Sequence, residues 1–103
     1  MNIGVDIVSI ERIKRLYEKY GTDFLDCFLT EQEMQEPITP RYLAKCWAVK
    51  EASIKASNVK SLTAFSYVKE NDIPKVQTQQ AGTYIVSVSD EDNYAIATVI
   101  KTQ

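Results

Sequence analysis

The chain has 103 residues, of which 45% are hydrophobic and 25% are charged, and its formal net charge is −2. This composition is typical of one globular domain, so we expect a single domain over residues 1–103. The charge argues against a nucleic-acid partner, and the lack of a long apolar run or a signal-peptide pattern predicts a cytoplasmic protein with no membrane span.

The first predicted element is a strand with a carboxylate inside it. Residues 2–8 alternate, with Ile3, Val5 and Ile7 on one face and Gly4, Asp6 and Val8 on the other. A helix is predicted to follow, because Ser9 is a suitable N-cap and Gly21 a suitable end. After Gly21 we expect a short helical turn with Phe24, Leu25 and Phe28 facing inward.

The longest predicted helix runs from Pro40 to about Ser57. Thr39 is its expected N-cap, with proline at the first helical position. Upstream, Thr30 and Glu33 fit a capping box for another short helix. Two stripes of residues follow the helical period: an apolar stripe of Leu43, Trp47 and Ile54, and a stripe of small residues, Ala44, Ala48 and Ala52. The small residues predict close approach of a neighbouring backbone.

Strands are predicted for most of the remaining chain, at residues 64–70, 83–89 and 93–100. The polar segment 71–82 reads as a loop with at most a short edge strand. This order of elements predicts a compact α+β domain in which the long central helix packs on an antiparallel sheet.

The chain has no histidine, so its chemistry must rely on carboxylates and lysines, with or without a hard metal ion. Glu51 and Lys55 are spaced for a surface ion pair worth about 0.2–0.5 kcal/mol, and Lys50 alone reads as a solvated lysine. Asp6 either caps the following helix or joins Glu51 around a cation such as Mg²⁺, with Lys50 and Lys55 beside phosphate oxygens. These alternatives remain open from the residues alone.

The helix after the first strand carries Arg12, Lys14, Arg15 and Lys19. A charge run of this kind is either a solvated face or a docking surface for an acidic partner.

Four blocks resemble a known family: "GVDIVSIERI" at 4–13, "FLTEQEM" at 28–34, "RYLAKCWAVKEASIKA" at 41–56 and "NYAIATVI" at 93–100. In this order they are similar to holo-acyl-carrier-protein synthase, the small bacterial type of 4′-phosphopantetheinyl transferase. The resemblance implies transfer of the phosphopantetheine arm of coenzyme A to a serine of apo-acyl carrier protein, with release of 3′,5′-ADP. It also implies a homotrimer, with the coenzyme A site between neighbouring subunits.

The resemblance assigns roles residue by residue. Asp6 and Glu51 would bind Mg²⁺ with the coenzyme A pyrophosphate, and Glu51 would accept the serine proton directly or through water. Lys55 would contact phosphate and stabilise the leaving group, Lys50 matches the other lysine of the motif, and Arg12 would meet the acidic carrier protein.

The sequence also departs from the family pattern. A glycine-containing turn usually follows the long-helix block, whereas this chain has "SNVKS" at 57–61. Cys46 stands where arginine is frequent, and Ser89-Asp90 stands where Ser-His is frequent. These departures leave a second interpretation, a relative that binds a carrier protein without catalysing transfer.

Overall fold

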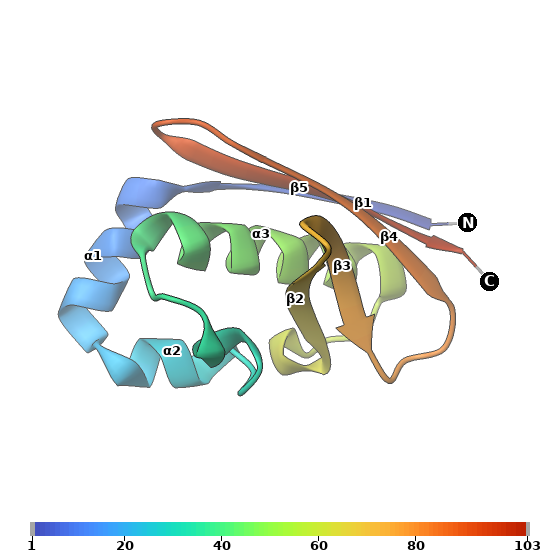
Figure 1. Ribbon diagram of the computed structural model, residues 1–103, viewed down its shortest axis with the longest axis horizontal. Helices are drawn as coiled ribbons and strands as arrows, with labels where there is room; N and C mark the ends of the chain where they lie inside the picture. Colours follow the sequence, from blue (N-terminus) through green and yellow to red (C-terminus); the bar gives the residue numbers. More distant parts are fainter. Residues whose placement is uncertain (1, 103) are drawn as a thin grey trace.

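The computed structural model describes residues 2–102, and Figure 1 shows the long helix α3 running beneath three long strands. In chain order the elements are β1 (Asn2–Ser9), α1 (Ile10–Tyr20), α2 (Thr22–Phe28), the 3₁₀ turn η1 (Glu33–Gln35), α3 (Pro40–Ser57), the 3₁₀ turn η2 (Leu62–Ala64), β2 (Phe65–Glu70), β3 (Ile73–Thr78), β4 (Thr83–Asp90) and β5 (Tyr94–Thr102). None of the helices within residues 2–102 has both the length and the apolar character needed to span a membrane.

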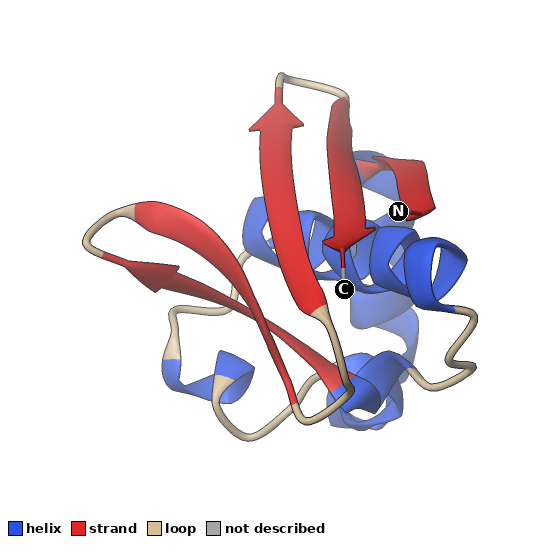
Figure 2. Cartoon of the chain, turned by 90° about the vertical axis from the view of Figure 1, so that its right-hand side faces the viewer, coloured by secondary structure: helices blue, strands red, loops and turns tan. Residues whose placement is uncertain are grey.

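The strands form two antiparallel sheets, one of three strands in the order β1-β5-β4 and a separate hairpin of β2 and β3. Figure 2 shows the hairpin crossing away from the larger sheet. The predicted α+β class is confirmed, and the polar segment 71–82, read as a loop with at most a short edge strand, contains the six-residue strand β3. Its turn is made by Asn71 and Asp72, both with positive φ, which is the conformation of a tight hairpin turn.

One face of α3 packs on the three-stranded sheet through the predicted stripe of alanines. Ala44, Ala48 and Ala52 are fully buried. On β1 the contact needs glycine, because a Cβ added at Gly4 would lie 2.0 Å from the backbone oxygen of Ala52. The small residues therefore let strand and helix backbones meet, as the sequence predicted.

The opposite side of α3 packs on α2 through aromatic rings. The Trp47 ring lies 6.1 Å from Phe24 and 5.1 Å from Phe28, measured between centroids. The helix starts also agree with prediction: the Ser9 hydroxyl accepts from the Arg12 amide, and the Thr39 hydroxyl accepts from the Tyr42 amide. These caps fix where α1 and α3 begin.

The outer face of the three-stranded sheet is apolar and uncovered. Its exposed large side chains are Ile3, Val5 and Ile7 from β1, Ile85 from β4, and Tyr94 and Ile96 from β5. The register places Ile3 opposite Ile100 and Ile7 opposite Ile96, so these side chains form continuous rows across the strands. An apolar face of this kind is typical of a surface that another protein covers.

Candidate functional site

Asp6 and Lys55 meet where β1 crosses the last turns of α3. The Lys55 ammonium lies 3.2 Å from the Asp6 carboxylate and donates to the Val5 carbonyl at 2.8 Å. Asp6 faces the helix because it lies on the Gly4 face of β1, and Gly4 lets the strand approach α3 this closely. Residues 49 positions apart are thereby joined at one polar point.

Asp6 is only partly exposed, and burial and nearby positive charges have opposite effects on its pKa. Burial raises the pKa of its carboxyl, while the hydrogen bond from Lys55 and the nearby positive charges of Lys55 and Arg12 oppose that shift. The capping interpretation of Asp6 is wrong, because the side chain that caps α1 is Ser9. Asp6 is instead a strand carboxylate held beside cations.

Glu51 lies one helical turn before Lys55, so both side chains project from the same side of α3. The expected surface ion pair between them is wrong, because the Lys55 ammonium bonds to β1 instead. Within residues 2–102, Glu51 forms neither an ion pair nor a side-chain hydrogen bond. Its half-buried carboxylate is therefore available to another ligand.

Two carboxylates fit a hard cation only if other oxygens complete its shell. Among residues 2–102 there is no group of three or more His, Cys, Asp or Glu side chains that could hold a metal ion. Mg²⁺ is usually bound by one or two carboxylates together with water and substrate phosphates. Asp6 and Glu51 suit that kind of shared site.

Arg12 is exposed on α1, as are Lys14, Arg15 and Lys19. Arg15 pairs with Glu11 on the same helix at 3.3 Å. Arg12 forms no side-chain ion pair within residues 2–102, and its charge reaches Asp6 through space. Arg12 on α1 thus lies near the Asp6 carboxylate of β1.

Lys50 lies in the interior, so its interpretation as a solvated lysine is wrong. Its side chain is fully buried, and its ammonium lies 2.6 Å from the Glu33 carboxylate. The sequence predicted Glu33 only as a capping-box residue, and the ion pair between Glu33 and Lys50 was not predicted. Lys50 is not brought together with Asp6 and Lys55.

Cys46 is also fully buried, close to Lys50 and Glu33. Burial and the Glu33 charge raise the pKa of its thiol. A protonated buried thiol is a poor nucleophile, so Cys46 is a packing residue.

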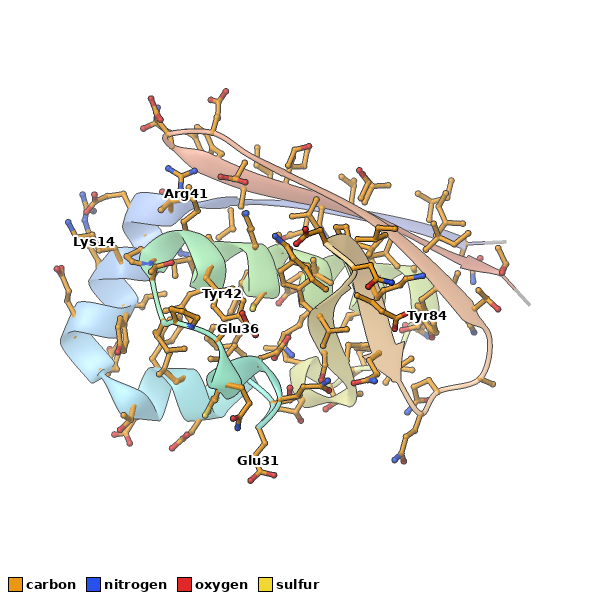
Figure 3. The ribbon with its side chains drawn as sticks, viewed as in Figure 1. Lys14, Glu31, Glu36, Arg41, Tyr42 and Tyr84 are labelled. Atoms are coloured by element: carbon orange, nitrogen blue, oxygen red, sulfur yellow. The ribbon has the colours of Figure 1, made fainter. Side chains whose placement is uncertain are left out.

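A second charged cluster joins the start of α3 to the end of β4. Arg41 and Lys45 both pair with Asp90, the latter at 3.1 Å, and Arg41 also donates to the Glu91 carbonyl at 2.9 Å. Figure 3 shows Arg41 beside the turn between β4 and β5. In the sequence, the i, i+4 spacing of Arg41 and Lys45 indicates two cations on one side of the helix, but this pattern was not recognised as part of a site.

The same two cations line a cavity of about 370 Å³ beside the start of α3. Its other lining residues include Tyr42, Tyr67 and Lys69. The cavity therefore lies at the start of α3, whereas the Asp6–Lys55 contact lies at the last turns of that helix.

The turn after α3 forms without the glycine that the resemblance led us to expect. Asn58 adopts the left-handed conformation, with φ of 63°, and its amide donates to the Ile54 carbonyl. Asparagine tolerates this conformation better than most residues. The sequence "SNVKS" therefore still ends the helix with a left-handed cap.

Comparison with known proteins gives consistent matches over nearly the whole chain. A family model described as the 4′-phosphopantetheinyl transferase superfamily matches residues 2–99. The holo-[acyl-carrier-protein] synthase of Thermodesulfovibrio yellowstonii is 40% identical, over 97% of this chain and 96% of the relative.

Solved structures of holo-[acyl-carrier-protein] synthases are also similar to this chain. The holo-[acyl-carrier-protein] synthase of Neisseria meningitidis matches with a TM-score of 0.89 and 30% identity, over 99% of this chain and 98% of that one. The Helicobacter pylori enzyme of the same name, crystallised with coenzyme A, matches with a TM-score of 0.86 and 26% identity, over 97% and 99%.

Proposed function

The chain belongs to the 4′-phosphopantetheinyl transferase superfamily, and we propose that it is a holo-acyl-carrier-protein synthase. It transfers the 4′-phosphopantetheine arm of coenzyme A to a serine of apo-acyl carrier protein and releases 3′,5′-ADP. The observation that carries the proposal is the contact of Lys55 with Asp6, one helical turn from a Glu51 carboxylate that has no side-chain partner among residues 2–102. We assign these residues to the metal and phosphate positions of the family on the resemblance of their motifs.

The reaction needs charge neutralisation and alignment more than a covalent nucleophile. The serine oxygen bonds to the phosphorus that carries pantetheine, and the pyrophosphate P–O bond to the 3′,5′-ADP leaving group breaks. Glu51 accepts the serine proton, directly or through water. Lys55, held at the site by Asp6 and the Val5 carbonyl, donates to the leaving phosphate oxygen and offsets its charge.

We assign Asp6 and Glu51 as the protein ligands of Mg²⁺. When bound, the ion neutralises the charge of the pyrophosphate. Support comes from the number and type of groups available, since one or two carboxylates are the usual protein ligands of Mg²⁺ and water and phosphate oxygens complete its shell.

The basic face of α1 is proposed to dock the acidic carrier protein. Arg12 is the central residue of this assignment, because it is exposed and its charge reaches Asp6. Electrostatic attraction at this face would speed the encounter and place the carrier serine near Glu51.

We further propose that the protein works as a homotrimer. The uncovered apolar rows of β1, β4 and β5 supply a surface for self-association. The Asp6–Lys55 contact lies at the last turns of α3 and the Arg41–Lys45 cavity at its first turns, so two separate parts of the chain are available for a neighbouring chain to complete one site. Arg41 and Lys45 would then bind coenzyme A phosphate across the interface.

A cytoplasmic location remains part of the proposal. The two cysteines are free, as is usual in that compartment.

Single substitutions test the assigned roles. Asp6→Ala and Glu51→Ala should each lower the transfer rate at least about 100-fold with the fold retained, because each removes a metal ligand. Lys55→Ala should mainly lower kcat. Lys75→Ala, at an exposed position on β3, is the matched control. A near-normal rate in Asp6→Ala or Glu51→Ala would remove that residue from the metal role.

A further inference from the structure

Lys50 and Glu33 form an ion pair in which both side chains are fully buried. The Lys50 ammonium lies 2.6 Å from the Glu33 carboxylate and also donates to the carbonyls of Leu62, at 3.2 Å, and Phe65. This lysine therefore ties the middle of α3 to the segment that leads into β2.

Glu33 extends the same network to three more groups. Its carboxylate accepts from the backbone amides of Tyr67, at 2.6 Å, and Thr30, at 2.9 Å. Its own carbonyl accepts from the Tyr42 hydroxyl at 2.8 Å. One glutamate thus links η1, β2 and α3.

A buried ion pair is not readily explained by its contribution to the stability of the fold. Taking two charges out of water is costly, and replacing a buried pair with apolar residues is often neutral or stabilising. Burial lowers the pKa of Lys50, while the Glu33 charge opposes that shift. The pair is therefore more readily explained by the geometry that it imposes.

That geometry bears on the neighbouring site residues. Lys50 directly precedes Glu51, and on the sheet side Gly4 lies against Ala52 and Lys55. The same stretch of α3 is consequently fixed from two directions. A rotation or shift of the helix would move Glu51 and Lys55 relative to Asp6.

We propose that Glu33 and Lys50 are positioning residues, a buried clamp that sets the rotation of α3 so that Glu51 and Lys55 face Asp6. Lys50 acts through the helix and does not bind phosphate. This inference rests on the proposed roles of Glu51 and Lys55.

The test compares Glu33→Gln/Lys50→Met with the wild type. This double variant removes both charges but keeps an acceptor for the Tyr67 amide. Ser53→Ala is the matched control, because Ser53 is buried on α3 and its hydroxyl, in the described part of the chain, donates only to the Val49 carbonyl of the same helix. Unfolding midpoints, coenzyme A affinity by calorimetry, kcat and the crystal structure are measured for each protein.

We expect the double variant to fold and to bind coenzyme A within about threefold of the wild type, while kcat falls at least about tenfold, since small misplacements of reacting groups are costly. In its crystal structure Lys55 should no longer lie within hydrogen-bond distance of Asp6. Ser53→Ala should keep the wild-type kcat and the contact between Lys55 and Asp6.

Two results would overturn the clamp. One is a double variant with wild-type kcat and an unchanged Lys55–Asp6 contact. The other is a double variant that loses coenzyme A affinity while its Lys55–Asp6 contact is unchanged, which would make Lys50 a direct ligand. Because the Lys55–Asp6 contact is read without any transfer, a failure of the proposed function is distinguishable from a failure of the clamp.

Discussion

Gly4 shows how one residue sets the distance between β1 and α3. A methyl group added there would lie 2.0 Å from the Ala52 oxygen and 2.9 Å from the Lys55 Cβ. We predict that Gly4→Ala costs about 3 kcal/mol of unfolding free energy or more, because backbone must move. Gly21→Ala, at a site with positive φ but open space, should cost about 1–3 kcal/mol through backbone strain alone. Urea unfolding measures both costs, and a Gly4→Ala cost below about 1 kcal/mol would contradict the packing account.

The ion pairs of Asp90 should make the stability of the fold depend on pH. The hydrogen bond from Arg41, aided by Lys45, lowers the pKa of the Asp90 carboxyl below its usual range. A lowered pKa in the folded state contributes stability above the unfolded pKa, and this contribution is lost as the pH falls through the folded pKa.

The stability difference between wild type and Asp90→Asn should therefore be constant above about pH 5 and shrink progressively below about pH 4. Urea unfolding across this range checks it. A difference that is the same at both ends of the range would show that the ion pairs do not stabilise the fold.

Some residue roles followed from the sequence and others did not. Asp6 stood out because a carboxylate is unusual inside an apolar strand. Lys50 did not, because helical spacing alone cannot tell a solvated lysine from one that is paired in the interior. Its partner Glu33 lies 17 positions away, and only tertiary packing brings them together. The Asp90 cluster depends on tertiary packing in the same way.

At the level of elements, α3 carries Arg41, Glu51 and Lys55, so its start influences the whole site. The Thr39 hydroxyl accepts from the Tyr42 amide at 3.1 Å. Thr39→Ala should cost about 1 kcal/mol, and Thr39→Ser should cost little, since serine also caps. Thermal unfolding of the two variants tests this, and equal losses would point to the threonine methyl group instead.

Element boundaries were predictable where local chemistry decides them. Ser9, Gly21, Thr39 and Pro40 mark helix ends through capping and backbone preference, and the helices begin and end there. For β3 the sequence indicated at most a short edge strand, because its turn uses Asn71 and Asp72 without glycine. Its polar side chains also lack the apolar alternation of a buried strand. Pairing with β2 makes it a strand, and that pairing is a tertiary effect.

At the scale of the whole molecule, the proposed trimer predicts that inactive chains complement one another. Asp6→Ala and Arg41→Glu should each be inactive alone, because each removes one half of a site that is proposed to be shared between neighbouring chains. Co-refolded in equal amounts, they should recover up to about a quarter of wild-type activity, since random assembly restores that share of interfaces. Light scattering should report three chains per particle. No recovery in confirmed mixed trimers would place the site within one chain.

The most direct test of the central claim is the mass of a carrier protein. Apo-acyl carrier protein is incubated with coenzyme A, Mg²⁺ and the wild-type protein, with Asp6→Ala as control, and is then weighed by mass spectrometry. We predict that the wild type adds one phosphopantetheine group and that Asp6→Ala adds almost none. A folded wild-type protein that adds no mass to any carrier tested would contradict the account and favour a relative that binds without transfer.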